Sequence, residues 1–121
     1  MVRYNADLRK EIERYLDYVI IVEGKKDVAS LRALGFTKVY AIHQTAVPLR
    51  ERVLQLVAQI GRKEKVCILT DFDRKGKQLY LMLKGLLQEQ GVRLDSTLRG
   101  ILLKAKVSHV EGLDAFMEKV G

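Results

Sequence analysis

The sequence predicts an α/β fold in which helices flank a doubly wound, mainly parallel sheet of four strands. Short apolar runs rich in β-branched residues alternate with segments whose apolar residues recur at helical spacing. Three times a strand run is followed by a helical segment, a glycine and another strand run, which favours right-handed crossovers between parallel strands. The chain has 121 residues, 48% of them hydrophobic, which suits one domain, residues 1–121, with a real core.

An N-terminal helix is expected within residues 1–17, because apolar residues there recur at helical spacing. Val19–Val22 is a continuous apolar run, typical of a strand that is covered on both faces. A short helix at residues 26–34 follows, and Gly35 can supply the left-handed residue that ends it. The second strand is predicted at residues 39–42.

The second crossover helix is predicted to begin near Pro48, because a first helical turn does not need the N–H that proline lacks. One apolar stripe runs through residues 49–60. The third strand is predicted at residues 66–69 and the third helix at residues 76–90, ended by Gly91. Its inward residues are expected to be Leu79, Met82, Leu83, Leu86 and Leu87.

The C-terminal segment, residues 96–121, is predicted to be helical, after a short fourth strand at residues 92–94. The run at residues 101–103 fits a helix or a strand, because short apolar runs do not separate the two. Ser108–Glu111 has the form of a capping box, which predicts a helix after it. The part of the domain that carries the motifs described below is residues 18–95.

The charge balance favours partners that carry phosphates. The chain has 22 basic and 15 acidic residues, a net charge of +7 and a pI near 9.6, although a basic soluble surface would give the same numbers. The single cysteine, Cys67, excludes an intramolecular disulfide and fits a core residue in a reducing compartment. No apolar stretch approaches the roughly 18 residues of a membrane span, and the first residues lack a secretory pattern, so we expect a cytoplasmic protein with no membrane partner.

Acidic residues follow two of the predicted strands. Glu23 closes the first strand, and Asp71 and Asp73 follow the third. Residues two apart in an extended chain point the same way, so the two aspartates would repel each other unless a basic side chain or a divalent cation offsets their charge. Ligands of open parallel sheets bind beyond the carboxyl ends of the strands. If strands one and three are neighbours, as in the order 2-1-3-4, Glu23 and Asp71 face each other there.

Basic residues flank these acids on the same two loops. Acids that hold a metal, surrounded by bases that hold phosphates, form the arrangement that phosphoryl chemistry needs, since Mg²⁺ takes one or two carboxylates plus substrate oxygens. The alternative is that the aspartates are turn and helix-cap residues and that Glu23 forms a surface ion pair. The predicted phosphate-binding residues are Lys25, Lys26, Arg74, Lys75 and Lys77.

Two stretches resemble the shared pattern of the Toprim domain family. A first strand that ends in Glu-Gly is present as Ile20-Ile-Val-Glu-Gly24, and a later strand that ends in Asp-x-Asp, with a glycine soon after, as Leu69-Thr-Asp-Phe-Asp-Arg-Lys-Gly76. The resemblance covers most of residues 18–95. Within the family, the chain looks like one of the small stand-alone Toprim proteins. Lys25-Lys-Asp27 is also similar to the opening motif of bacterial-type primases and of the bacterial ribosomal-RNA maturation nuclease.

The resemblance implies that Glu23 is an acid/base or metal-binding residue and that Asp71 and Asp73 coordinate Mg²⁺, for which Mn²⁺ can substitute. It implies a nuclease or nucleotidyl-transfer activity on RNA or DNA. Two alternatives stay open: a non-catalytic RNA- or ribosome-binding module, or a subunit of a larger nucleic-acid-processing complex. An aspartyl-phosphate enzyme of the haloacid-dehalogenase type, with Asp71 as nucleophile, fits less well because Lys75 stands where that class has Thr or Val. Nuclease-like relatives often carry a glycine where this chain has His43-Gln-Thr45.

Overall fold

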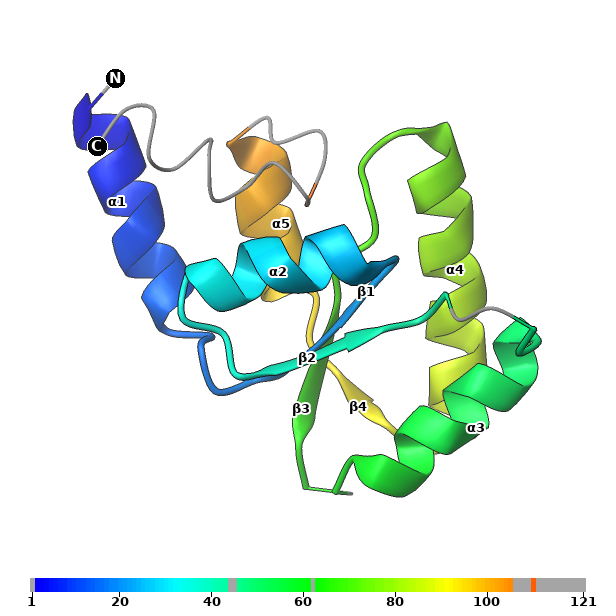
Figure 1. The fold of residues 1–121 in the computed structure, drawn as a ribbon. Helices are drawn as coiled ribbons and strands as arrows, with labels where there is room; N and C mark the ends of the chain where they lie inside the picture. Colours follow the sequence, from blue (N-terminus) through cyan, green and yellow to red (C-terminus); the bar gives the residue numbers. More distant parts are fainter. Residues whose placement is uncertain (1, 44–45, 62, 106–109, 111–121) are drawn as a thin grey trace.

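The computed structural model describes residues 2–43, 46–61, 63–105 and 110 (Figure 1). The strands in these residues form one sheet in the order β2-β1-β3-β4, and every neighbouring pair is parallel. The predicted α/β class is therefore confirmed, and the strand order is the one under which Glu23 and Asp71 were expected to face each other. The strands are β1 (Val19–Val22), β2 (Lys38–Ala41), β3 (Lys65–Ile68) and β4 (Arg93–Leu94).

The helices lie close to their predicted positions. The first helix ends four residues earlier than predicted, and the run at residues 101–103, which the sequence left open, is helical. The predicted capping box and the helix after it lie outside the described residues, except for Val110. The described helices are α1 (Val2–Glu13), α2 (Lys25–Ala33), α3 (Leu49–Gln59), α4 (Arg74–Glu89) and α5 (Thr97–Lys104).

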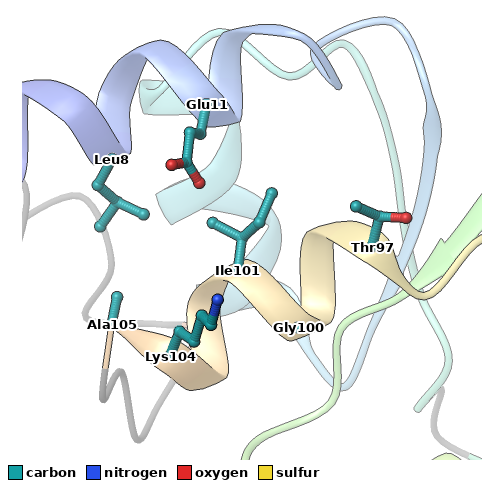
Figure 2. Close-up of a pocket in the computed structure, with 7 residues that line it drawn as sticks. All are labelled: Leu8, Glu11, Thr97, Gly100, Ile101, Lys104 and Ala105. Atoms are coloured by element: carbon teal, nitrogen blue, oxygen red, sulfur yellow. The ribbon is translucent and has the colours of Figure 1, made fainter.

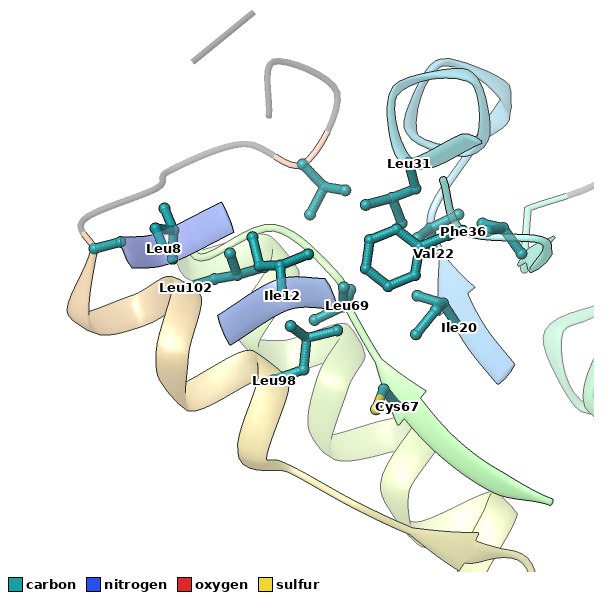
Figure 3. Packing of buried hydrophobic residues seen from close by; sticks show 13 residues of the cluster. Leu8, Ile12, Ile20, Val22, Leu31, Phe36, Cys67, Leu69, Leu98 and Leu102 are labelled. Atoms are coloured by element: carbon teal, nitrogen blue, oxygen red, sulfur yellow. The ribbon is translucent and has the colours of Figure 1, made fainter. Parts of the chain in front are cut away.

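Helices cover both faces of the sheet, which explains why the strands are apolar throughout. Side chains alternate between the two faces of a strand, so Ile20 and Val22 of β1 point to one core and Val19 and Ile21 to the other. The first core is formed with α1, α2 and α5 (Figure 3). The second is formed with α3 and α4.

The strand register sets the carboxyl ends of β1 and β3 side by side. Ile21 of β1 pairs with Ile68 of β3, and the ladder continues for one more residue because the Leu69 amide donates to the Ile21 carbonyl at 2.8 Å. On the other side, the Ile42 amide donates to the Val22 carbonyl at 2.8 Å. The residues that follow β1 and β3 therefore emerge next to each other at one edge of the sheet.

Helix ends and faces agree with the sequence in most places. Gly35 has a φ of 106°, which confirms the left-handed residue expected after α2. Met82 was expected inward, but 56% of its surface is exposed. It was wrongly placed because the buried line of α4 follows Leu83 and Leu87, and Met82, one residue before Leu83, is rotated by about 100° away from that line. Within the described residues, no helix combines the length and the apolar character needed to span a membrane.

Candidate active site

A hydrogen bond joins the two acids that the topology was expected to bring together. Oε2 of Glu23 accepts from the backbone amide of Asp71 at 2.8 Å, although the two residues are 48 positions apart in the chain. The backbone of Glu23 is itself held by the amide of His43, which donates to the Glu23 carbonyl at 3.0 Å. Both acids are partly exposed. The structure thus places one carboxylate from the end of β1 directly against the loop that follows β3.

Asp71 is held at three points by three different parts of the chain. Its amide donates to Glu23, its carbonyl accepts from Nη2 of Arg99 at 3.2 Å, and its Oδ1 accepts from the amide of Val110 at 2.8 Å. A carboxylate offers about four acceptor positions, so the bond from Val110 leaves capacity for a cation. Val110 itself is buried in the core that contains α5. The position of Asp71 therefore depends on the C-terminal part of the chain as well as on the sheet.

Asp73 has a different environment from Asp71. It is the N-cap residue of α4, and its Oδ1 accepts from the amide of Gly76 at 2.7 Å. The strand ends at Ile68, so the two aspartates do not project from one extended strand as predicted. Asp73 thus caps a helix, as the alternative expected, and its side chain is exposed.

The three acids do not form a ready three-carboxylate cluster. Within the described part of the chain, no group of three or more His, Cys, Asp or Glu side chains is arranged to hold a metal ion. Mg²⁺ in proteins is often bound by one or two carboxylates, with water and substrate oxygens completing its shell. The pair of Glu23 and Asp71 fits that smaller donor set.

The glycine of the Asp-x-Asp motif is required by close packing. A Cβ atom on Gly76 would lie 2.1 Å from the carbonyl oxygen of Asp71, a distance that only a glycine avoids. The fully buried Thr70 stabilises the same contact, because its Oγ1 donates to the Gly76 carbonyl at 2.7 Å. The first turn of α4 thus rests directly on the backbone of Asp71.

Asp27 explains part of the motif that follows Glu23. Its side chain is 6% exposed, and its Oδ2 accepts from the amide of Gly24 at 2.8 Å, which satisfies an N-terminal donor of α2. This bond fixes the turn between β1 and α2, directly after Glu23. The aspartate of the Glu-Gly-Lys-x-Asp pattern is therefore accounted for as a helix-capping residue.

The predicted phosphate-binding residues lie at the beginnings of two helices. Lys25 and Lys26 begin α2, and Arg74, Lys75 and Lys77 lie in the first turns of α4. All five side chains are exposed. Both helices begin at the edge of the sheet that carries the acids, and a helix N-terminus adds partial positive charge. The acids are thus bordered by positive charge from both sides of the β1–β3 junction.

Arg99 of α5 is a site residue that the sequence did not reveal. Its Nη1 donates to the Thr70 carbonyl at 2.7 Å, and its guanidinium lies 4.5 Å from the ring centre of Phe72 and 4.4 Å from that of Tyr80. Burial lowers the pKa of Arg99, while Tyr80, Glu23 and Asp71 act in the opposite direction. One arginine among the apolar residues of a short helix carries no local signal of this role.

The acids lie at the edge of the sheet, beyond the ends of β1 and β3. A groove of about 600 Å³ lies elsewhere, between α1 and α5 (Figure 2). Its described lining residues include none of the acids or basic residues discussed above; they are Leu8, Glu11, Thr97, Gly100, Ile101, Lys104 and Ala105.

Comparisons with known proteins agree with the fold. A model of the Toprim domain matches residues 17–97. A UPF0292 protein of Methanosarcina barkeri is 34% identical over 107 residues, which cover 84% of this chain and 71% of that protein. A UPF0292 protein of Pyrococcus horikoshii is 36% identical over 101 residues, which cover 84% of this chain and 73% of that protein. DNA primase DnaG of Methanocella arvoryzae is 40% identical over 72 residues, 60% of this chain and 13% of the primase. A solved structure of a protein from Aquifex aeolicus aligns with a TM-score of 0.72 and 29% identity, covering 88% of this chain and 94% of that one.

Proposed function

This chain belongs to the Toprim domain family, and from that premise we propose that it catalyses Mg²⁺-dependent cleavage or transfer of phosphodiester bonds in RNA or DNA. The observation that supports this most directly is the 2.8 Å hydrogen bond from the Asp71 amide to Glu23. It brings the acids of both family motifs together at the edge of the sheet where ligands of such folds bind. A nuclease is the simplest activity of this kind.

The acids would bind the metal and handle a proton. Glu23 and Asp71 would hold Mg²⁺, with the carboxylate of Asp73 at the start of α4 available to a larger shell. When bound, the ion stabilises charge that develops on a phosphate oxygen. Glu23 would either complete this ligand set or accept a proton from the attacking hydroxyl group or water. The hydrogen bond from the Asp71 amide holds one oxygen of the Glu23 carboxylate against the loop that follows β3.

The basic residues would bind the phosphates on either side of the reacting one. Such contacts supply affinity without reading sequence. Replacing one of them, as in Lys75→Gln, should weaken binding and reduce the slope of log K against log salt by roughly 0.7–0.9. Lys84→Gln is the matched control, because Lys84 is an exposed lysine farther along the same helix. Equal slopes for the two variants would count against a phosphate contact at Lys75.

The catalytic proposal is tested by a cleavage panel of structured RNAs and DNAs with Mg²⁺ or Mn²⁺. Asp71→Asn keeps the shape of the side chain and removes its charge, so we expect at least a hundredfold loss of cleavage with nucleic-acid affinity retained. Asp17→Asn, at an exposed position before β1, is the control. If wild type and an Asp71→Ala, Asp73→Ala double variant bind RNA alike and neither cleaves it with Mg²⁺, the proposal is wrong.

A non-catalytic RNA- or ribosome-binding module is the second candidate. It is favoured by one observation, namely that an oxygen of the Asp73 carboxylate is used to cap α4. Such a module would keep the fold and its basic rim. A titration with Mn²⁺, followed through paramagnetic broadening of the Glu23 and Asp71 resonances, distinguishes the two. Broadening at these residues supports the enzyme, and its absence supports the module.

A further inference from the structure

We propose that Arg99 is a positioning residue that keeps Asp71 bonded to Glu23. It acts on the acidic loop, residues 69–73, which connects β3 to α4. The inference deepens the proposed function and rests on it only where metal binding is concerned. The structural part, that Arg99 fixes the direction of the Asp71 amide, can be tested without a metal or a substrate. Arg99 lies beyond residue 97, where the match to the family model ends.

Arg99 supplies donors where the sheet lacks a strand. The last residue of β4, Leu94, pairs with Val66, so β4 does not reach the acidic loop. In the acidic loop, the carbonyls of Thr70 and Asp71 accept instead from the two terminal nitrogens of the Arg99 guanidinium. Nη1 donates to the Thr70 carbonyl at 2.7 Å and Nη2 to the Asp71 carbonyl at 3.2 Å. One side chain of α5 therefore replaces the missing ladder partner at the end of β3.

Arg99 and Glu23 hold opposite ends of one peptide group. The carbonyl of Thr70 and the amide of Asp71 belong to the same trans peptide plane, in which C=O and N–H point in opposite directions. Arg99 binds the oxygen of this peptide at 2.7 Å and Glu23 accepts from its N–H at 2.8 Å. Rotation of this peptide plane would break both bonds. The arginine thus fixes the direction of the amide that joins the two acids.

The guanidinium is itself held in place by two aromatic rings. Its central carbon lies 4.5 Å from the ring centre of Phe72, in the acidic loop, and 4.4 Å from that of Tyr80, in α4. Both distances are within the range of cation–π attraction. A lysine at this position would keep the charge but lose the planar fork and the stacking. The side chain therefore joins α5, the acidic loop and α4 through a geometry that only arginine provides.

The experiment compares Arg99→Gln and Arg99→Lys with Arg93→Gln, which removes one positive charge from an exposed position on β4. Hydrogen exchange of individual amides, followed by NMR in metal-free protein, reports the bond from Asp71 to Glu23 directly. We expect both Arg99 variants to exchange the Asp71 amide at least ten times faster, with the Ile20–Val22 amides of β1 unchanged. Arg93→Gln should exchange like wild type.

The change in Mg²⁺ affinity is a second measurement, because loss of charge and loss of positioning change this affinity in opposite directions. Loss of a nearby positive charge, taken alone, would tighten cation binding. Loss of a partner that orients a ligand typically weakens metal binding by about 10–100-fold. We therefore expect both Arg99 variants, including the charge-preserving lysine, to bind Mg²⁺ at least tenfold more weakly than wild type, with Arg93→Gln close to wild type.

The outcomes separate this inference from the proposed function. An unchanged Asp71 exchange rate in both Arg99 variants would overturn the positioning role, and so would faster exchange spread equally over β1. Mg²⁺ binding that tightens in Arg99→Gln would also overturn it. If wild type binds no Mg²⁺ while the Asp71 amide still exchanges faster in both variants, the proposed function fails and the positioning role stands.

Discussion

Gly76→Ala is the substitution whose effect follows most directly from the structure. A methyl group at this position would lie 2.1 Å from the carbonyl oxygen of Asp71 and 2.6 Å from its carbonyl carbon. Carbon–oxygen contacts in proteins are about 3.3 Å or longer, so the first turn of α4 would have to move by about 1 Å. That movement strains two bonds of 2.7 Å, from Thr70 Oγ1 to the Gly76 carbonyl and from the Gly76 amide to Asp73.

The expected loss of stability can be estimated from these contacts. Overpacking costs about 1–3 kcal/mol, and each weakened hydrogen bond about 1 kcal/mol. Replacing glycine by alanine within a helix gains about 1 kcal/mol. The free energy of unfolding should therefore fall by about 2–4 kcal/mol. Because the moving turn rests on Asp71, the proposed Mg²⁺ binding should weaken as well.

Gly85→Ala is the matched control for this prediction. Gly85 lies in the same helix, and a methyl group there would meet nothing within 4 Å. Urea unfolding should show Gly85→Ala to be more stable than wild type by up to about 1 kcal/mol and Gly76→Ala to be less stable. If Gly76→Ala is as stable as wild type, or gains stability as Gly85→Ala does, the close contact with Asp71 does not exist in solution.

Substitutions at three further positions test other parts of the fold. Ala46 has a φ of 65°, a left-handed conformation that strains alanine but not glycine. Ala46→Gly should relieve about 1–2 kcal/mol of this strain and lose about 0.4–1 kcal/mol because glycine makes the unfolded chain more flexible. Urea unfolding should therefore show Ala46→Gly to be more stable than wild type by roughly 0.5–1 kcal/mol. Burial raises the pKa of Cys67 from 9.0 to about 12. The unfolded chain therefore releases this proton first as the pH rises, and between pH 8 and 10 wild type should lose about 1.4 kcal/mol more unfolding free energy than Cys67→Ala. Asp73→Ser keeps an oxygen that can cap α4, so its unfolding free energy should stay within about 0.5 kcal/mol of wild type. Asp73→Ala removes the cap and should lose about 1 kcal/mol. Equal losses in the two variants would argue against the cap.

The fold could be predicted because its signals are local. Val19–Val22 is apolar throughout since both faces of β1 are covered, and Gly35 marks the end of α2 because its φ of 106° is accessible mainly to glycine. The same local reasoning misplaced Met82, since an apolar side chain one residue away from the buried line of a helix looks the same in sequence as one within it. Adjacent residues of a helix point about 100° apart, so helical spacing does not decide which of two neighbouring apolar residues is buried.

The candidate site could be predicted only where topology alone decides it. Glu23 and Asp71 meet because the order 2-1-3-4 makes β1 and β3 neighbours, which was the condition on which the sequence argument depended. The contacts of Arg99 and Val110 with Asp71 depend on how α5 and the residue beyond it pack against the acidic loop. No spacing rule connects residues 28 and 39 positions apart, so these contacts emerge only from the folded chain.

Asp73 shows why the motif itself could not separate a structural from a chemical role. A helix cap needs only an oxygen acceptor before the first turn, and serine, threonine or asparagine would serve as well as aspartate. A metal site needs negative charge, which only the carboxylate supplies. In the structure one oxygen of Asp73 caps α4, whose first turn also carries Arg74 and Lys75 and rests on Asp71. The cap therefore fixes a carboxylate at the start of α4, directly after the loop that carries Asp71, so a capping role and a metal-binding role would favour the same residue at this position.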